Sequence, residues 1–284
     1  SKEGIIHISM TYLQEGDEVL VPDPGYPAYA AATQLTGATA RFYDLNAERK
    51  WLPDLDELEA TNLSHVKLMW VNYPHMPSGA KASESFFKAL VDFGARNNIL
   101  ICHDNPYSFI LNDKPQSLLK AGVNEHVIEL NSLSKSHNMA GWRVGMLAGA
   151  QQHIDHILTF KSNVDSGTFL PVQLAAIEAL RQDQTWYQQL NTVYKQRKNI
   201  VFQILDELES TYSSNQAGMF VWAKVPDHVS DVAAWVDQLI EESEVFITPG
   251  FIFGKNGSRY VRISLCQTEK IIRKALTRIK NRKK

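Results

Sequence analysis

Few residues of this sequence point to a disulfide scaffold, a metal centre or a nucleic-acid surface. Only two of the 284 residues are cysteines, Cys102 and Cys266. Each lies in an apolar run, so we expect two buried free thiols in a reducing compartment, the cytoplasm. No cysteines or histidines have metal-ligand spacing, and we expect no metal. The formal net charge is only −2, which argues against nucleic acid as a partner of this chain.

Long hydrophobic runs are also missing. No apolar stretch approaches the roughly 20 residues that a membrane-spanning helix needs, and no signal peptide is visible. The hydrophobic fraction of 44% and the charged fraction of 21% are those of a globular protein. We therefore expect no membrane contact, and a length that suits one large domain or two modest ones.

The first half of the chain alternates short apolar strands with turns and helical patterns. Strands are predicted at residues 18–22, 38–45, 66–72, 99–103 and 127–131, and helices at 2–13, 26–36, 55–60 and 83–97. This order predicts an α/β fold, with a mostly parallel sheet and helices on both faces. A further strand predicted at 144–149 follows the preceding loop without a crossover helix, whereas a parallel return needs about a dozen residues that are usually helical. We expect that strand to run antiparallel.

The second half has a different pattern, with more helix. Helical periodicity covers 154–162, 171–181 and a long stretch from about 185 to 211. Strands are predicted at 219–224, 245–247 and 260–265, and helices at 232–242 and 269–280. We therefore expect a large domain over residues 1–183 and a smaller α+β domain over residues 184–284.

Polar residues gather where three of the predicted strands end. Asn72 ends one strand, Asp104 and Tyr107 follow a second, and Ser132 and Lys135 follow a third. The carboxyl ends of parallel strands meet at one edge of an open sheet, where ligands bind. The sequence therefore predicts a ligand site at this edge.

The stretch SLSKSHNMAGWRVG, residues 132–145, is the most informative part of this edge. Its lysine, Lys135, lies between two hydroxyls, and its amine can form a Schiff base with a carbonyl if its surroundings lower its pKa. The hydroxyls of Ser132 and Ser134 and the guanidinium of Arg143 are suited to holding a phosphate. Taken alone, the stretch is equally compatible with a loop that carries a solvated lysine.

Four ordered motifs together resemble a known family over nearly the whole chain. S-x-S-K with an arginine eight residues later is the pattern of class I/II aminotransferases of fold type I, which depend on pyridoxal 5'-phosphate (PLP). Supporting matches are D-P-G-Y-P-A-Y at 23–29, D-N-P-Y at 104–107 and Y-V-R-I-S-L at 260–265. The opening S-K-E-G resembles the end of the family's G-S-K-E-G motif. We therefore expect a missing upstream segment, which in relatives supplies a lid, part of the small domain and an arm to the partner subunit.

The resemblance implies a role for each residue type at the chemical centre. Lys135 would carry PLP covalently and then act as the general base. Asp104 would pair with the pyridine nitrogen, Tyr107 would donate to the phenolic oxygen and Tyr26 would stack on the ring. Arg262 would bind the α-carboxylate of the substrate with a two-pronged hydrogen bond.

The same resemblance implies a cradle for the cofactor's phosphate. Ser132, Ser134 and Arg143 would supply side-chain donors. The backbone N–H groups of Ser1 and Lys2, at the start of the first predicted helix, would supply the rest.

One position departs from the family pattern. The turn after the strand at 66–72 usually reads N-P-T-G, and its asparagine bonds the phenolic oxygen of PLP. Here the turn begins with Met76, which has no hydrogen to donate. Asn72 is expected near the ring, and we hypothesise that Tyr107 is left as the main donor, so that the Schiff base has a higher pKa than in relatives.

The resemblance implies a homodimeric aminotransferase that exchanges an amino group between an amino acid and a 2-oxo acid by a ping-pong mechanism. Three alternatives stay open. A PLP-dependent β-lyase or decarboxylase would use the same lysine, aspartate and arginine. An aminotransferase-like sensor domain of a transcription regulator would carry its DNA-binding module upstream. A truncated, inactive paralogue would bind the cofactor without turnover.

Overall fold

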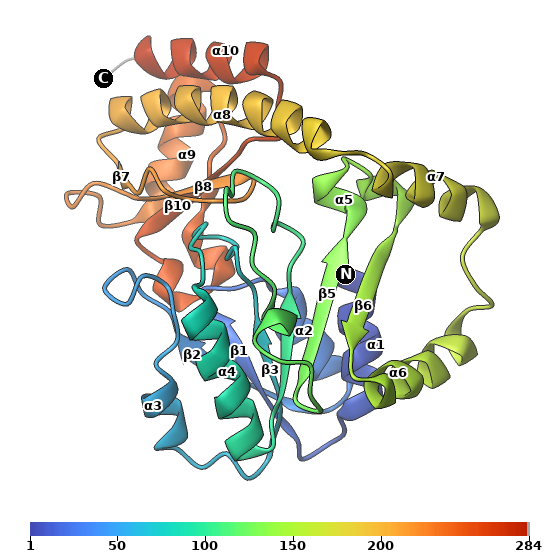
Figure 1. The fold of residues 1–284 in the computed structure, drawn as a ribbon. Coiled ribbons are helices and arrows are strands. Elements are labelled where there is room, and N and C mark those ends of the chain that lie inside the picture. The colour runs from blue at the N-terminus through green and yellow to red at the C-terminus, as the bar shows by residue number, and fades with distance from the viewer. Residues whose placement is uncertain (283–284) are drawn as a thin grey trace.

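The computed structural model describes residues 1–282, and Lys283 and Lys284, the last residues of the predicted small domain, lie outside them. The first half forms a six-stranded sheet in the order β2-β1-β3-β4-β5-β6 (Figure 1). The strands are β1 (Glu18–Asp23), β2 (Thr39–Asp44), β3 (Val66–Val71), β4 (Leu100–Asp104), β5 (Val127–Ser132) and β6 (Gly145–Gly149).

The pairing of these strands follows the prediction. β1 to β5 pair in parallel, and β6 runs antiparallel to β5. The link between β5 and β6 holds only two short helical turns, at Leu133–Ser136 and Ala140–Trp142, and no crossover helix, which leaves the antiparallel return as the accessible connection. The predicted α/β class with one antiparallel strand is confirmed.

Helices cover both faces of this sheet (Figure 1). One face packs against α1 (Lys2–Tyr12), α2 (Ala28–Leu35) and α6 (Gln151–Val164), and the other against α3 (Leu55–Glu59) and α4 (Glu84–Asn97). Side chains of a strand alternate between faces. On β4, Leu100 and Cys102 therefore join the α1–α2 core, while Ile101 joins the α4 core.

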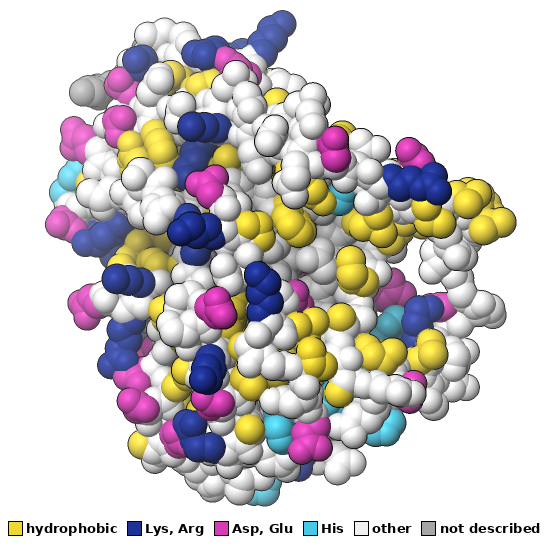
Figure 2. Space-filling model, in the orientation of Figure 1, with side chains coloured by type: hydrophobic (Ala, Val, Ile, Leu, Met, Phe, Trp, Pro, Cys, Tyr) yellow, Lys and Arg dark blue, Asp and Glu magenta, His cyan; other side chains and the backbone are white. Residues whose placement is uncertain are grey.

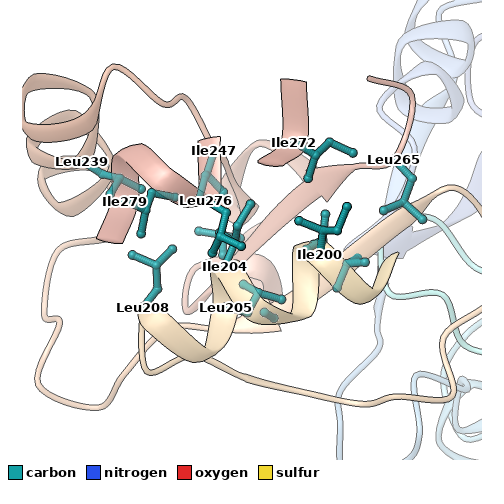
Figure 3. Close-up of a cluster of buried hydrophobic side chains, with 14 of the residues drawn as sticks. Ile200, Ile204, Leu205, Leu208, Leu239, Ile247, Leu265, Ile272, Leu276 and Ile279 are labelled. Atoms are coloured by element: carbon teal, nitrogen blue, oxygen red, sulfur yellow. The ribbon is translucent and has the colours of Figure 1, made fainter. Parts of the chain in front are cut away.

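The second half is built on the long helix α8 (Gln184–Glu207), which follows α7 (Leu170–Leu180). Its four-stranded sheet has the order β7-β8-β10-β9 with antiparallel neighbours. The strands are β7 (Thr211–Tyr212), β8 (Phe220–Lys224), β9 (Thr248–Pro249) and β10 (Tyr260–Ser264), and helices α9 (Val232–Ser243) and α10 (Glu269–Lys280) complete the unit. Figure 3 shows its core, where Ile200, Ile204 and Leu205 of α8 meet Ile272 and Leu276 of α10.

Two contacts dock the second unit on the carboxyl end of the large sheet. The carboxylate of Asp23, at the end of β1, accepts hydrogen bonds from the backbone N–H groups of Lys255 (3.1 Å) and Asn256 (3.0 Å). The backbone N–H of Ala217 donates to the carbonyl of Gly79, in the turn after β3. A Cβ on Gly79 would lie 2.7 Å from the Gln216 side chain, so this close approach requires glycine.

Three local predictions for the second half were wrong. The long helix ends at Glu207 instead of about 211, because Glu209 takes a left-handed backbone (φ 53°) and the chain then enters β7. The strand predicted at 245–247 is irregular, and pairing with β10 begins only at Thr248. Cys266 is an exposed thiol, while Cys102 is buried as predicted.

The first helix after β1 also begins later than predicted. α2 starts at Ala28 rather than Tyr26. Tyr26 precedes Pro27, and a residue before proline is disfavoured in the helical region. Among residues 1–282, no helix has both the length and the apolar composition that crossing a bilayer requires.

Candidate active site

A cavity of about 430 Å³ lies at the carboxyl ends of the parallel strands, where the second unit docks. Every residue that the sequence assigned to the site lines this cavity: Ser1, Lys2, Tyr26, Asn72, Asp104, Tyr107, Ser132, Ser134, Lys135, Arg143 and Arg262. These residues come from both halves of the chain. The tertiary structure therefore brings the predicted set together in one place.

Lys135 is carried by a single helical turn, α5 (Leu133–Ser136), directly after β5. The hydroxyl of Ser132 caps this turn by accepting from the backbone N–H of Ser134 (3.1 Å), and it donates to the carbonyl of Val144 (3.2 Å). Side-chain capping is the reason that serine is favoured where a helix begins. The cap holds the half-buried Lys135 side chain at the cavity wall.

The turn that bears Lys135 is also fastened to α8. The indole N–H of Trp186 donates to the carbonyl of Ser136 (2.8 Å). The ring of His137 stacks on that of Trp186 with centroids 6.0 Å apart, and its Nε2 lies 3.4 Å from the Tyr187 hydroxyl. His137 therefore packs against α8 and does not line the cavity.

Asp104 ends β4 and is the acidic residue among those lining the cavity. Its side chain is 4% exposed. Oδ2 accepts a hydrogen bond from the Tyr29 hydroxyl (3.0 Å), whereas Oδ1 has no hydrogen-bond partner among residues 1–282. Burial raises the pKa of Asp104, since a charged carboxylate is poorly solvated there. A cation placed next to Oδ1 would favour the ionised form.

Asn72 is buried below the same wall and is already engaged by the main chain. Its Nδ2 donates to the carbonyl of Asp104 (2.5 Å), and its Oδ1 accepts from the backbone N–H of Met76 (2.7 Å). The amide thus ties the ends of β3 and β4 together. It orients Asp104 through the backbone.

Arg262 projects from β10 into the cavity from the opposite unit. Its guanidinium lies between two aromatic rings, with the Phe220 centroid at 4.0 Å and the Phe253 centroid at 4.4 Å. Cation–π contacts of this kind hold a guanidinium in a fixed plane. Nη1 approaches the Met76 Sδ at 3.3 Å, and Nε has no partner among the described residues. Burial lowers the pKa of Arg262, and an incoming carboxylate would pair with it.

The remaining wall is cationic and rich in donors. Arg143 takes a left-handed backbone (φ 55°), which ends a short helical turn, and its Nη1 donates to the carbonyl of Ala140 (2.7 Å). Ser1 and Lys2 start α1 on the same wall, where the first N–H groups of a helix are free. This end of the cavity favours a doubly charged anion such as a phosphate monoester.

Two tyrosines proposed for the site, Tyr107 and Tyr26, also line the cavity. Burial raises the pKa of Tyr107, so its hydroxyl stays protonated and available as a donor at neutral pH. The ring of Tyr26 is half-buried and lies nearly perpendicular to that of Tyr29, with centroids 5.6 Å apart.

These observations fit PLP. The half-satisfied buried Asp104 matches a pyridinium nitrogen, and the cationic end matches a phosphate. Lys135 supplies an amine to the same cavity. Among residues 1–282, no three histidine, cysteine or carboxylate side chains are grouped as a metal site.

Several lining residues had no role in the sequence interpretation. Tyr29 is the clearest case, because it holds Asp104, and the D-P-G-Y-P-A-Y motif that contains it was the available signal. Phe220 and Phe253 sandwich Arg262 but carry no sequence signal of their own. A second cavity, of about 600 Å³ beside α9, contains none of the predicted site residues.

Comparison with known proteins gives consistent matches over both units. Residues 1–279 match the family described as aminotransferase class I and II. The LL-diaminopimelate aminotransferase of Dehalococcoides mccartyi is 40% identical over 284 residues, which cover 99% of this chain and 73% of that protein. The LL-diaminopimelate aminotransferase of Desulforudis audaxviator is 42% identical over 268 residues, 93% of this chain and 68% of that protein.

Solved structures agree with these relatives. The apo structure of BacF from Bacillus subtilis matches with a TM-score of 0.92 at 34% identity, over 98% of this chain and 72% of that one. A probable N-succinyldiaminopimelate aminotransferase from Thermus thermophilus matches with a TM-score of 0.88 at 28% identity, over 98% of this chain and 75% of that one.

The raised pKa of Asp104 gives a prediction for the protein free of any ligand. The native state keeps this proton to higher pH than the unfolded chain, so its contribution to the free energy of unfolding falls as pH rises through the raised pKa. Asp104→Asn should therefore be more stable than the parent at pH 7 by about 1–3 kcal/mol, the cost of a poorly satisfied buried group. The advantage should shrink toward pH 4, near the unfolded pKa of about 3.9.

Urea denaturation of both proteins across this pH range measures the difference. The exposed loop residue Asp113 offers a matched control, and Asp113→Asn should differ from the parent by a constant amount. A difference between Asp104→Asn and the parent that does not vary with pH would contradict a raised pKa.

Proposed function

The chain belongs to the class I and II aminotransferases, and from this premise we propose that it binds PLP through Lys135 and exchanges an amino group between an amino acid and a 2-oxo acid. The family assigned from the motifs is confirmed. The observation that carries the residue-level proposal is the single cavity in which Lys135, the half-satisfied Asp104 and the aromatic-clamped Arg262 converge. No observation favours a lyase, a decarboxylase or a sensor domain.

The cofactor would supply an aldehyde for covalent attachment and a pyridine ring that accepts electron density from the substrate. Lys135 is the proposed point of attachment. Once displaced by the substrate amine, its Nζ stays within the cavity and takes the proton from the substrate's Cα. The Ser132 cap and the Trp186 hydrogen bond limit how far the turn that carries Lys135 can move.

Three side chains are proposed to hold the ring. Asp104 would pair through Oδ1 with the ring nitrogen and keep it protonated, while the Tyr29 hydroxyl holds Oδ2. Tyr107 would donate to the phenolic oxygen, and Tyr26 would stack on the ring face. The phosphate would lie against Ser132, Ser134, Arg143 and the start of α1 at Ser1 and Lys2.

Arg262 is the proposed receptor for the substrate's α-carboxylate. The two flanking rings exclude water from the guanidinium faces, so its free edge is left to pair with a carboxylate. As the amino donor we propose LL-diaminopimelate first, because the relatives reported above carry that activity in their names.

We further propose a cytoplasmic homodimer with its cofactor domain at 1–183 and a small domain at 184–284. The helix α7 supports the dimer. Its large apolar side chains at Leu170, Leu174, Ile177 and Leu180 recur at helical spacing and are 47–62% exposed. Figure 2 shows hydrophobic side chains gathered on the projecting segment that carries α7 in Figure 1. An apolar stripe of this size is typical of an interface.

The attachment at Lys135 is tested by absorbance. Purified parent with added PLP should develop a visible absorbance band that persists through dialysis. Lys135→Ala should lose both the band and the activity, because Lys135 is proposed both to attach PLP covalently and to act as the general base. Adding LL-diaminopimelate should discharge the band, and 2-oxoglutarate should restore it. A band discharged only by other amino acids would contradict the proposed donor. Release of ammonia and pyruvate without an acceptor would instead indicate a β-lyase.

The methionine in the turn after β3 predicts an altered pH response. Met76→Asn should lower the pKa read from the visible band by roughly one unit, because an amide N–H next to the phenolic oxygen stabilises its anion. Met76→Leu has similar bulk and no donor, and it should titrate like the parent. Identical titration curves for Met76→Asn and the parent would remove Met76 from this role.

The dimer is tested by light scattering coupled to size exclusion. The parent, with a chain mass of 32.1 kDa, should elute as a species of twice that mass. Leu174→Glu should shift it to the monomer, because a charge would be buried in the apolar stripe. Leu35→Glu, at a leucine of α2 that is 70% exposed against 57% for Leu174, should stay dimeric. A monomeric parent at all concentrations would contradict the proposal.

A further inference from the structure

A buried acid–base pair lies behind Asp104, on the opposite face of the large sheet. His103 precedes Asp104 on β4, and Glu129 is its partner in the register with β5. His103 Nδ1 is 2.9 Å from Glu129 Oε2. His103 is fully buried and Glu129 is 8% exposed. None of the cofactor or substrate roles proposed above uses either side chain.

Glu129 gathers donors from the chain that follows Asp104. Its Oε2 accepts from the Ser117 hydroxyl (2.9 Å) and the backbone N–H of Leu118 (2.8 Å). Its Oε1 accepts from Asn105 Nδ2 (3.3 Å). Burial alone would raise the pKa of Glu129, but the hydrogen bonds, that from His103 foremost, hold it below its usual value. A carboxylate that stays charged in this buried position needs the hydrogen bond from His103 to stabilise it.

His103 also contacts the chain that follows β3, the neighbouring strand on the other side of β4. Its Nε2 lies 3.0 Å from the carbonyl oxygen of Tyr73 and 3.3 Å from the Tyr73 backbone nitrogen. The Phe87 ring packs on the imidazole with centroids 4.9 Å apart. The peptide of Tyr73 directly follows Asn72, whose amide holds the Asp104 carbonyl.

His103 and Glu129 are thus hydrogen-bonded to groups on both sides of Asp104. Through Tyr73 it reaches Asn72 on the β3 side, and through Asn105 it reaches the residue after Asp104. Among residues 1–282, the Asp104 carboxylate accepts a hydrogen bond from the Tyr29 hydroxyl through Oδ2, and its Oδ1 has no partner. The position of Asp104 therefore depends on groups that do not line the cavity.

We propose that His103 and Glu129 are positioning residues that hold Asp104 against the cofactor's ring nitrogen, His103 by joining the Glu129 carboxylate to the chain that follows β3. The inference rests on the proposed function, because it needs a bound PLP. Removing His103 breaks its hydrogen bonds to Glu129 and to the Tyr73 peptide, so the backbone on both sides of Asp104 is held less firmly. An Asp104 side chain that moves away from the ring nitrogen cannot keep that nitrogen protonated.

A pair that served packing alone would have different consequences. Its loss would lower the stability of the whole protein but would leave the folded fraction with a normal cofactor site. Ile101, on the same strand and the same face, allows this to be separated. Ile101→Ala removes buried volume without changing any charge or hydrogen bond.

The experiment compares parent, His103→Asn, Glu129→Gln, the double variant and Ile101→Ala. Each is made as full-length protein, stripped of cofactor, checked for folding by thermal denaturation, and titrated with PLP by fluorescence quenching. The ¹⁵N chemical shift of PLP labelled at the ring nitrogen then reports the protonation of that atom directly. This shift does not depend on turnover.

His103→Asn should raise the PLP dissociation constant by about tenfold or more, the equivalent of one pKa unit at Asp104. It should also move the ¹⁵N signal toward unprotonated pyridine. The double variant should show effects no larger than those of His103→Asn alone, because the two side chains act as one hydrogen-bonded unit and their effects are not additive. Ile101→Ala should lose stability while its folded form keeps the parent's dissociation constant and ¹⁵N shift. Glu129→Gln, which preserves shape, replaces His103→Asn if that variant does not fold.

Parent-like ¹⁵N shifts and dissociation constants in His103→Asn and Glu129→Gln overturn the proposal, as do changes that Ile101→Ala reproduces. A parent that binds no PLP overturns the proposed function, and this inference falls with it. A parent that binds PLP normally while the variants stay unchanged overturns the positioning role alone.

Discussion

A buried carboxylate with one satisfied oxygen is the constraint on which the rest of the cavity depends. Asp104 lies at the end of a central strand, where water is excluded and only the Tyr29 hydroxyl meets it directly. A charge in such a place is costly, and burial raises the pKa of Asp104 although the Ser1 amino group and the Tyr29 hydroxyl act to lower it. The cost is offset when a cation arrives at Oδ1. The site is therefore less stable than a repacked core would be, and it is suited to one kind of ring.

The second constraint is that the two halves of the chain must meet over this carboxylate. Arg262 comes from β10 and reaches the cavity because contacts such as those of Asp23 and Gly79 hold the second unit on the sheet edge. Phe220 and Phe253, also from that unit, then fix the plane of the guanidinium. Docking thus places one fixed cation for a carboxylate across from the residues proposed to hold the ring.

Much of this arrangement could be predicted from the residues in order. Alternating apolar strands and turns predicted the parallel sheet, and the lack of a crossover helix before 144–149 predicted its antiparallel strand, because a parallel return usually runs through such a helix. The polar residues at strand ends predicted the site edge. Local rules failed where backbone geometry took over, as at Glu209, whose left-handed conformation ends α8 early, and at Thr248, where pairing begins later than its apolar neighbours suggested.

The residues that the sequence interpretation missed share one property, which is that their partners are distant in the chain. Tyr29 bonds a residue 75 positions away, and His103 bonds one 26 positions away. Nothing near His103 in the sequence marks its contact, and the D-P-G-Y-P-A-Y motif contains Tyr29 without indicating its partner. Conversely, Asn72 lines the cavity as expected, but its side-chain amide is hydrogen-bonded to the main chain of Asp104 and Met76. Only the folded chain could reveal these two hydrogen bonds.

The sequence by itself determined the family, the order of the strands and helices that build the sheet, and the choice of Lys135 as the lysine proposed to attach PLP. These depend on local patterns and on motifs a few residues long. Only the tertiary structure decided that Asp104 keeps one oxygen free, that Arg262 lies between two rings beside Met76, and that a buried acid–base pair stands behind the site. Burial and hydrogen-bond partnership are properties of the assembled chain, and the charge of a group follows from them.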